Sequence, residues 1–227
     1  MFDVIETQID ERVVKIYKAA GENLPVIYAN DYEESGREVL AECEALGCLP
    51  FHLVTISKIG WDAYLSPWVS EPVVAKNDNF KGLASEYLGW LLSKVVPYAE
   101  KTLAVKNPKS YIAGYSMAGL FALWSLYQTD FFAGAVAASG SLWFPRFREY
   151  ALENTFPQTP EKIYLSLGDR ESAGKNPVLQ RTETIFRELA AHYAEQNISV
   201  TFELNKGNHF KDINQRVAKG YKWLLEN

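Results

Sequence analysis

The amino-acid sequence predicts an α/β fold in which helices cover both faces of a mostly parallel central sheet. Two observations lead to this prediction. From residue 24 onward, short apolar runs of strand length alternate with stretches that repeat apolar residues at helical spacing, and no internal repeat interrupts them. Strands that alternate with helices in this way join a parallel sheet. With 227 residues, 48% of them hydrophobic, the chain can build one sizeable core, so we expect a single domain over residues 1–227.

The chain before residue 58 predicts four strands and one helix. Residues 2–6 and 12–18 have short alternating or apolar patterns, which suit an opening antiparallel pair. The apolar run 24–29 predicts a buried strand, and residues 51–57 predict another. Between these two strands, residues 37–46 place their apolar side chains on one helical face and are followed by a glycine that ends the helix.

Residues 58–81 have no clear period and are rich in Trp, Pro, Ser, Asn and Gly, so they predict a long loop. A loop of this length in a compact domain is usually functional or mobile. Its Trp61 and Trp68 are candidates for a wall that faces a substrate, with packing onto the core as the alternative. The helical stretch 83–103 follows, and Pro97 predicts a kink or a break in it.

The second half of the chain continues the alternation. We expect strands at residues 111–113, 134–138, 163–167 and 199–204, and helices at residues 120–127, 177–196 and 213–225. A connection with a short helix spans residues 144–160. Because no long insertion separates the second and third of these strands, we expect no large lid, which favours a short acyl group or a soluble ester as substrate.

The most specific chemical signal is the turn Gly114-Tyr115-Ser116-Met117-Ala118-Gly119, which stands between a predicted strand and a predicted helix. A serine at such a turn has a strained backbone, so the residues two before and two after it must be nearly free of side chain. Gly114 meets this demand, and Ala118 departs from it by one methyl group. The turn predicts Ser116 as a nucleophile above a helix N-terminus; an ordinary N-cap serine is the alternative.

A serine nucleophile needs a base, and the chain offers three histidines. His52 lies inside a predicted strand, where we expect a packed imidazole. His192 lies inside a predicted helix, where we expect a surface or half-buried position. His209 lies in a loop just past the last predicted strand. In parallel sheets the functional groups gather beyond the carboxyl ends of the strands, so the sequence favours His209 as the base.

The carboxylate that orients the base is expected at the end of the strand before it. The segment Leu167-Gly168-Asp169-Arg170-Glu171 offers two acids there. The spacing after the strand-end glycine resembles that of many hydrolases of this architecture and favours Glu171. Asp169 is the alternative acid, with turn formation or helix capping as its other role. The order serine, acid, histidine along the chain is the one expected for a nucleophile elbow.

Acyl transfer also needs donors that stabilise the oxyanion of the tetrahedral intermediate. The backbone N–H of Met117, directly after the nucleophile, is the first predicted donor. The second is expected from the loop after the 24–29 strand, which contains Asn30-Asp31-Tyr32. We predict the backbone N–H of Tyr32 as this donor, with that of Asp31 as the alternative.

Composition and charge exclude several classes of function. A net charge of -5 and a pI near 5.4 argue against binding to nucleic acid or to anionic membranes. Cys43 and Cys48 are expected to be free thiols, because with His52 they do not match a zinc spacing, so no metal site is predicted. The acidic N-terminus lacks the basic and apolar regions of a signal peptide, and a cytoplasmic location is the expectation.

These stretches resemble the Putative esterase family of α/β-hydrolases, which includes esterase D-like, feruloyl-esterase-like and enterochelin-esterase-like enzymes. The matching stretches follow the family's order along nearly the whole chain. They are Pro25-Val26-Ile27-Tyr28, the elbow from Gly114 to Leu123, Ser139-Gly140-Ser141-Leu142-Trp143, Leu167-Gly168-Asp169-Arg170-Glu171 and Asn208-His209-Phe210. The resemblance implies an α/β-hydrolase fold and the hydrolysis of carboxylic esters.

For the site, the resemblance implies Ser116 as nucleophile, His209 as base and Glu171 or Asp169 as acid, with Trp143 lining the pocket near the nucleophile. The sequence therefore predicts a serine esterase that acts on a small-molecule ester without a cofactor. Acyl transfer to an alcohol by the same residues is one alternative, and a non-catalytic binding protein of this fold is another. The physiological ester and the oligomeric state are left open.

Overall fold

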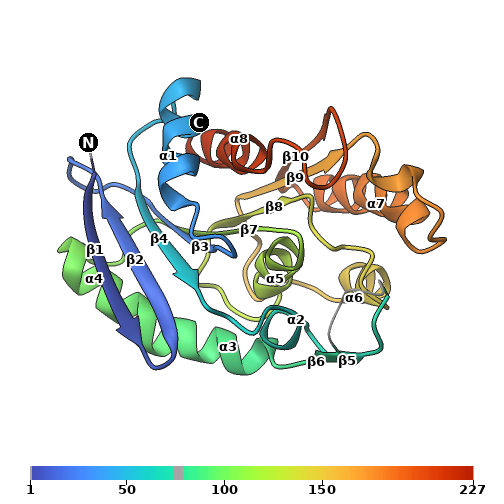
Figure 1. Cartoon of the computed structure of the whole chain (residues 1–227), viewed down its shortest axis with the longest axis horizontal. Helices are drawn as coiled ribbons and strands as arrows, with labels where there is room; N and C mark the ends of the chain where they lie inside the picture. The colour runs from blue at the N-terminus through green and yellow to red at the C-terminus, as the bar shows by residue number, and fades with distance from the viewer. Residues whose placement is uncertain (1, 74–78, 227) are drawn as a thin grey trace.

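The computed structural model describes residues 2–73 and 79–226 and is built on an eight-stranded sheet (Figure 1). The strands of this sheet are β1 (Asp3–Ile9), β2 (Arg12–Lys18), β3 (Val26–Asn30), β4 (His52–Ser57), β7 (Ser110–Tyr115), β8 (Gly134–Ala138), β9 (Lys162–Gly168) and β10 (Ser199–Asn205). Their order across the sheet is β1-β2-β4-β3-β7-β8-β9-β10. The β1–β2 and β2–β4 pairs are antiparallel, and all pairs from β4 to β10 are parallel.

Helices cover both faces of the sheet. The longer helical segments are α1 (Gly36–Leu46), α3 (Ala84–Trp90), the π-helical η1 (Leu91–Val95), α4 (Val96–Leu103), α5 (Met117–Ser125), α6 (Phe147–Glu153), α7 (Thr182–Glu195) and α8 (Ile213–Leu225). Helices α1 and α8 pack against each other on one face, and α3 to α7 cover the other (Figure 1). The predicted α/β architecture with its mostly parallel sheet is confirmed.

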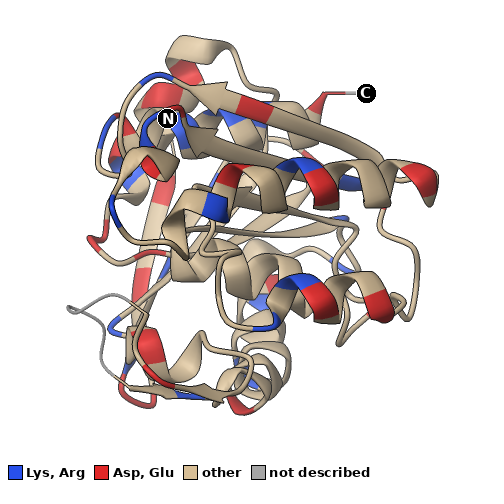
Figure 2. Ribbon diagram, turned by 90° about the vertical axis from the view of Figure 1, so that its right-hand side faces the viewer, with Lys and Arg blue, Asp and Glu red and all other residues tan. Residues whose placement is uncertain are grey.

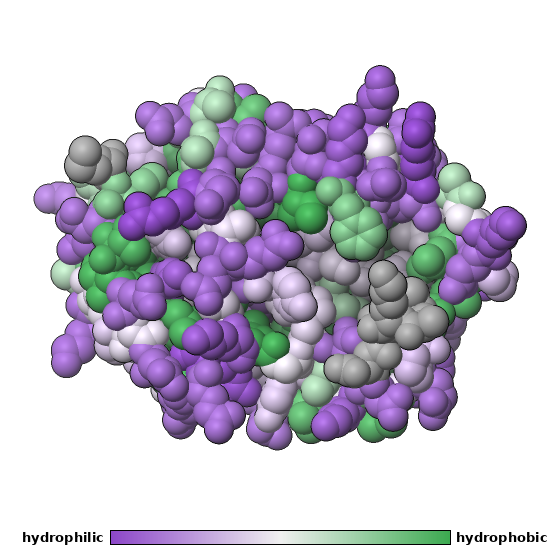
Figure 3. All heavy atoms as spheres, in the orientation of Figure 1, coloured by the Kyte–Doolittle hydropathy of each residue, from purple (hydrophilic) through white to green (hydrophobic). Residues whose placement is uncertain are grey.

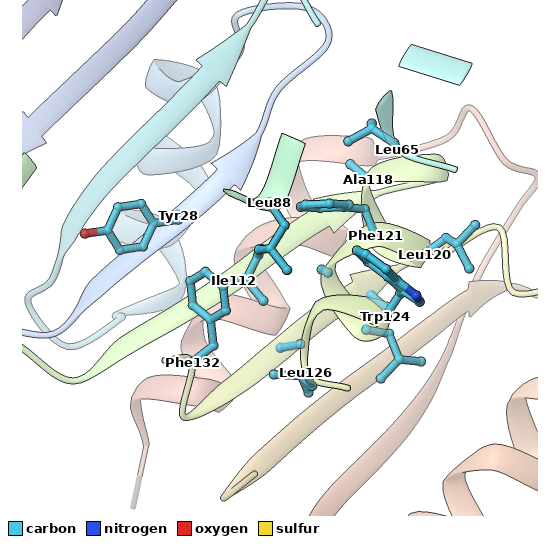
Figure 4. Close-up of a cluster of buried hydrophobic side chains, with 14 of the residues drawn as sticks. Tyr28, Leu65, Leu88, Ile112, Ala118, Leu120, Phe121, Trp124, Leu126 and Phe132 are labelled. Atoms are coloured by element: carbon cyan, nitrogen blue, oxygen red, sulfur yellow. The ribbon is translucent and has the colours of Figure 1, made fainter. Parts of the chain in front are cut away.

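The alternation of side chains along each strand divides the core into two apolar clusters. Ile112 of β7 faces the larger cluster, where it packs among Leu88 of α3 and Phe121 and Trp124 of α5 (Figure 4). The neighbouring side chains of the same strands face the smaller cluster beneath α1 and α8. Every residue of α5 is buried, so this helix is fixed on all sides by apolar packing.

The long loop predicted at residues 58–81 contains short elements. They are α2 (Trp61–Tyr64), β5 (Val69–Ser70) and β6 (Phe80–Lys81), and residues 74–78 of the loop lie outside the described residues. A kink or break was expected at Pro97; the helix instead passes through the π-helical turn η1 just before it. Pro97 is the second residue of α4, in a helical segment that continues without a break from α3 through η1.

The helix predicted at 177–196 begins later, at Thr182. Before it, the side chain of Asn176 accepts a hydrogen bond from the backbone N–H of Val178 at 2.9 Å, and a 3₁₀ turn, η3 (Leu179–Arg181), follows. This local side-chain bond competes with helix formation at residues 177–181, the start of the predicted helix. The chain between β8 and β9 forms the short helix α6, and the described residues include no large lid.

Acidic and basic residues are interspersed along the helices nearest the viewer in Figure 2. The face shown in Figure 3 is mostly hydrophilic, with small separate hydrophobic patches. Within residues 2–73 and 79–226, no helix is long and apolar enough to cross a bilayer. Cys43 and Cys48 are free cysteines, as the sequence predicts.

Candidate active site

Ser116 occupies a single strained position between the end of β7 and the start of α5. Its φ of 59° and ψ of -123° lie in a region of backbone conformation that residues other than glycine rarely adopt. The backbone N–H of Ser116 donates to the carbonyl of Ala138 at 3.1 Å, and the carbonyl of Ser116 accepts from the N–H of Ser141 at 2.9 Å. Bonds to the end of β8 and to the loop after it therefore fix the strained residue.

Close packing explains the composition of the turn. A Cβ atom on Gly114 would lie 2.3 Å from the carbonyl carbon of Ala118 and 2.5 Å from its methyl carbon. The methyl group of Ala118 thus uses the space that the missing side chain of Gly114 leaves, and one glycine is enough at this contact. A Cβ on Gly119 would lie 2.9 Å from the Cα of Gly140, so α5 also packs tightly against the loop after β8.

Three side chains form a hydrogen-bonded chain that begins at the elbow. The Oγ of Ser116 lies 3.1 Å from Nε2 of His209, and Nδ1 of the same ring lies 2.7 Å from Oε2 of Glu171. His209 comes from the loop after β10, and Glu171 begins the 3₁₀ turn η2 (Glu171–Ala173) after β9. The ends of three parallel strands therefore bring together residues that are 93 and 38 positions apart in the sequence.

The carboxylate of Glu171 is buried and fully bonded. Its Oε1 accepts hydrogen bonds from the backbone N–H of Gly168 at 2.7 Å and from the hydroxyl of Ser139 at 2.8 Å, and its side chain is only 8% exposed. Burial acts to raise the pKa of Glu171, but the hydrogen bonds and charge of His209, with those from Gly168 and Ser139, outweigh it and lower this pKa. The carboxylate is therefore ionised at neutral pH.

Asp169, the alternative acid, makes a different set of contacts. Its Oδ1 accepts a hydrogen bond from the backbone N–H of Gly207 at 2.8 Å, and the N–H of Arg170 donates to the carbonyl of Gly207 at 3.1 Å. These bonds tie the turn after β9 to the loop that carries His209. The structure brings Glu171, and not Asp169, to the imidazole.

The sequence prediction missed Arg216, whose guanidinium lies beneath this cluster. It comes from α8, is 1% exposed, and its Nη1 lies 3.1 Å from Oε1 of Glu171. The same nitrogen donates to the hydroxyl of Ser139 at 3.0 Å, and Nη2 donates to the carbonyl of Asn208 at 3.0 Å. One signal could have found it: Arg216 stands in the apolar stripe of its helix, three residues after Ile213.

Tyr115, the residue before the nucleophile, also holds the base. Its hydroxyl donates to the backbone carbonyl of His209 at 2.6 Å, and it accepts from Nη1 of Arg216 at 3.2 Å. Ser141 adds a further hydroxyl near the reacting group, with its Oγ 3.4 Å from that of Ser116. Neither residue was singled out from the sequence, because these contacts join segments far apart in the chain.

The predicted oxyanion donors belong to the start of α5 and to the turn after β3, and both segments line the cavity beside Ser116. Met117 begins α5, where the first N–H groups of a helix have no helical partner. The N–H of Asp31 donates to the carbonyl of Ile56 at 2.8 Å and is therefore occupied. Within the described part of the chain, the N–H of Tyr32 has no hydrogen-bond acceptor, so Tyr32 is the available donor of the two predicted.

Comparison with known proteins identifies the family of this chain. A family model described as Putative esterase matches residues 7–210. The chain belongs to this family. No curated protein matches its sequence.

Solved structures share the fold of this esterase-family chain at low identity. An IroE-like serine hydrolase from Shewanella oneidensis has a TM-score of 0.76 and 16% identity, with 99% of this chain and 80% of that chain covered. The BES protein from Bacillus cereus has a TM-score of 0.73 at 17% identity and coverage of 100% and 96%. The siderophore hydrolase EstA from Aspergillus nidulans has a TM-score of 0.71 at 16% identity and coverage of 98% and 93%.

A cavity of about 1160 Å³ opens beside Ser116 in this esterase-family structure. Trp61 and Trp143 line it, as expected, and the ring of Trp61 packs edge-on against that of Tyr32 at 5.2 Å. Trp68, the third predicted wall residue, does not line the cavity. Its indole N–H donates to the carbonyl of Pro145 at 3.0 Å, and its ring packs against that of Phe144 at 5.6 Å.

The other two histidines lie outside the site. Nδ1 of buried His52 accepts a hydrogen bond from the backbone N–H of Ala19 at 3.1 Å, and burial lowers the pKa of His52. His192 of α7 bonds to the side chain of Gln196, the residue that follows the end of this helix, at 2.8 Å. Among residues 2–73 and 79–226, no three His, Cys, Asp or Glu side chains come together as a group that could hold a metal ion.

Proposed function

We propose that this chain is a serine hydrolase that cleaves carboxylic esters through an acyl-enzyme. The hydrogen-bonded chain of Ser116, His209 and Glu171 at the elbow carries this proposal. Membership of the esterase family supports esterase activity, and the fold neighbours include proteins described as a serine hydrolase and as a siderophore hydrolase. The substrate class is a small-molecule ester.

In the first half of the reaction, Oγ of Ser116 attacks the carbonyl carbon of the ester while Nε2 of His209 takes its proton. The buried carboxylate of Glu171 holds the ring with Nδ1–H toward it and stabilises the imidazolium that forms. The C–O bond to the alcohol then breaks, and His209 returns the proton to the leaving oxygen. Water attacks the acyl-enzyme by the same proton relay, which releases the acid and restores Ser116.

The oxyanion of both tetrahedral intermediates would be stabilised by the N–H groups of Met117 and Tyr32. The first lies at the N-terminus of a fully buried helix, where backbone donors and the helix dipole favour negative charge. The second lies in the turn after β3, the strand that pairs with β7. Each such donor typically contributes about 3 kcal/mol to transition-state stabilisation.

The test is the hydrolysis of p-nitrophenyl acetate by wild type and by Ser116→Ala. We expect kcat to fall by at least about 10⁴-fold, because the base then has no hydroxyl to activate. Ser199→Ala, an exposed serine at the start of β10, is the matched control and should keep wild-type activity. A fluorophosphonate should label wild type and the control, but not Ser116→Ala. Hydrolysis that survives in Ser116→Ala would contradict the proposal.

Added alcohol separates hydrolysis from the alternative of acyl transfer. A hydrolase should release mainly the free acid, because water reaches the acyl-enzyme through the open mouth beside His209, whose side chain is 29% exposed. If most of the acyl group passed to a primary alcohol present at millimolar concentration, the chain would be an acyltransferase with the same three residues.

A further inference from the structure

The chain contains two cysteines, Cys43 and Cys48, and the proposed ester hydrolysis uses neither of them. Both are free thiols in this structure. Cys43 lies near the end of α1, and Cys48 follows the glycine that ends this helix. We call these two residues the thiol pair. They lie where α1 packs beside α8 (Figure 1), so both helices determine their surroundings.

The backbone at the end of α1 brings the thiol pair together. Gly47 has a left-handed φ of 70°, and its N–H donates to the carbonyl of Glu44 at 3.1 Å. The N–H of Cys48 donates to the carbonyl of Cys43 at 3.0 Å. These two bonds form a Schellman motif, in which the second residue after the helix contacts its last turn. The bond between the cysteines leaves their Cα atoms at most about 7 Å apart, which a disulfide can span.

The side chains of the thiol pair also meet. The thiol of Cys43 donates a hydrogen bond to the sulfur of Cys48. Sγ of Cys48 lies 3.9 Å from the backbone carbonyl of Ala218 in α8, which limits how far this side chain can turn away from the helix end. The fold therefore holds the two sulfurs next to each other.

The two thiols differ in exposure and in acidity. Cys43 is 3% exposed, whereas Cys48 is half-buried, so small molecules in solvent can reach only the second sulfur directly. The hydrogen bond from Cys43 lowers the pKa of Cys48, although burial acts against this shift. The same hydrogen bond, together with burial, raises the pKa of Cys43. Cys48 is therefore the thiol that forms the thiolate, which is the reactive form of cysteine.

Two charged groups at the end of α8 act on this thiolate. The ammonium group of Lys222 lowers the pKa of Cys48, and the carboxylate of Glu226 raises it. The two side chains form an ion pair at 3.6 Å, so each offsets part of the charge of the other. An accessible, acidic thiol beside a second thiol is the arrangement that makes cysteines sensitive to oxidation.

We propose that the thiol pair is an oxidation site at which a hydroperoxide converts Cys43 and Cys48 into an intramolecular disulfide. The thiolate of Cys48 attacks one oxygen of hydrogen peroxide, the O–O bond breaks, and hydroxide leaves to take up the proton that the thiol had released. The sulfur of Cys43 then attacks the sulfenic acid, and the S–O bond breaks as a disulfide forms. The hydroxyl group leaves with the proton of Cys43 as water. The two sulfurs lose two electrons in all, and the peroxide gains them.

The first experiment exposes wild type to hydrogen peroxide and counts its free thiols after denaturation. We expect both thiols to be lost together, the mass to fall by that of the two thiol hydrogens, and dithiothreitol to restore both. No covalent dimer should form on a non-reducing gel. Persistence of both thiols would overturn the inference, and so would a gain of oxygen at Cys48 while Cys43 remains a thiol.

Single variants test the order of the two steps. In Cys43→Ala the sulfenic acid of Cys48 has no partner, so dimedone should label it and no disulfide should form. In Cys48→Ala the remaining thiol is buried and should react with peroxide at least about tenfold more slowly than Cys48 does in Cys43→Ala. Equal rates in the two variants would contradict the assignment of Cys48 as the attacking thiol. The thiol count of wild type decides the inference even where a variant does not fold.

The melting temperature tests whether the folded protein accommodates the bond. Because the Schellman motif already holds the two residues within disulfide range, the oxidised protein should melt at the same temperature as the reduced protein or higher. A lower melting temperature after oxidation would show that the bond distorts the end of α1, and the native geometry would then not carry the inference.

Lys222→Met tests the charge that favours the thiolate. We expect the rate of oxidation at neutral pH to fall at least about twofold, with a smaller fall at high salt, because salt screens a partly exposed charge. Lys106→Met, at an exposed lysine between α4 and β7, is the matched control and should react as wild type does. An unchanged rate in Lys222→Met would contradict the role of this charge.

The thiol pair is independent of the proposed ester hydrolysis. Neither cysteine lines the cavity beside Ser116, so Ser116→Ala should form the disulfide at the rate of wild type. Slower oxidation in Ser116→Ala would place the reaction with peroxide at the active site and would overturn the inference.

Discussion

The nucleophile and the base with its acid are held in place by different physical means. Ser116 stands on a backbone turn that is wedged between the end of β7 and a helix buried on every side. His209 and Glu171 lie in turns outside the sheet, where hydrogen bonds and a buried ion pair with Arg216 fix them. The elbow is positioned by packing, and the acid–base pair is positioned by charge and hydrogen bonds.

This difference determines what each region tolerates. Packing forces act at short range and change little with pH, so the elbow should respond to added volume and not to altered charge. A buried polar network depends on the balance of its charges, so the loss of one member leaves its partners unsatisfied. Substitutions in the two regions should therefore fail in different ways.

Among substitutions that keep the nucleophile, the largest effect is expected from Glu171→Gln in the polar region. The amide keeps the shape of the side chain but cannot stabilise the imidazolium, and it can bind the ring in the wrong tautomer. We expect kcat for p-nitrophenyl acetate to fall by about 10³- to 10⁴-fold with KM nearly unchanged. A fall of less than tenfold would show that Glu171 does not serve the base.

The next largest effect is expected from Gly114→Ala in the packed region. The new methyl group would lie 2.3 to 2.4 Å from backbone atoms of Ala118 and 2.5 Å from its methyl carbon, so the elbow must shift. A displacement of about 1 Å at a reacting group can lower the rate by about 100-fold. Gly89→Ala is the matched control, because a Cβ there meets nothing within 4 Å. Steady-state kinetics at several pH values should show the same fold-loss of kcat at each pH.

A smaller effect on rate, with a distinct dependence on pH, is expected from Arg216→Met. The variant leaves the buried carboxylate of Glu171 without its counter-charge, which should cost about 3 kcal/mol of stability. The uncompensated carboxylate favours the protonated imidazole of His209, so the acid limb of the kcat/KM profile should move to higher pH, with about a tenfold loss of kcat at neutral pH.

Two further variants separate this charge effect from simple loss of packing. Arg216→Lys keeps the charge and should leave the acid limb near its wild-type position. In the double variant Arg216→Met/Glu171→Gln, no carboxylate is left uncompensated, so its urea midpoint should exceed that of Arg216→Met alone. An acid limb that does not move in Arg216→Met would contradict the electrostatic role.

The smallest effect is expected from Asp169→Asn. The amide oxygen of asparagine can still accept the hydrogen bond from the N–H of Gly207, so the loop that carries His209 should keep its place. We expect kcat to change less than about tenfold. A larger loss than that of Glu171→Gln would reverse the assignment of the two acids.

The sequence alone predicted the α/β class, the esterase family and the elbow, because these features depend on residues close together in the chain. Hydrophobic periodicity locates strands and helices one at a time, and the contact between Gly114 and Ala118 spans only one turn. The strand ends that carry Glu171 and His209 could also be predicted, since parallel strands place their carboxyl ends at one edge of the sheet.

Spacing in the sequence favours Glu171 over Asp169, but only the tertiary structure shows which carboxylate meets the imidazole, because the direction of a side chain in a tight turn depends on its distant neighbours. It alone placed the guanidinium of Arg216 beneath them, since that contact joins residues 45 positions apart. It also moved Trp68 out of the cavity wall, because the indole N–H of this residue bonds to the carbonyl of Pro145. Such features arise from the packing of distant segments, which local patterns in a sequence do not encode.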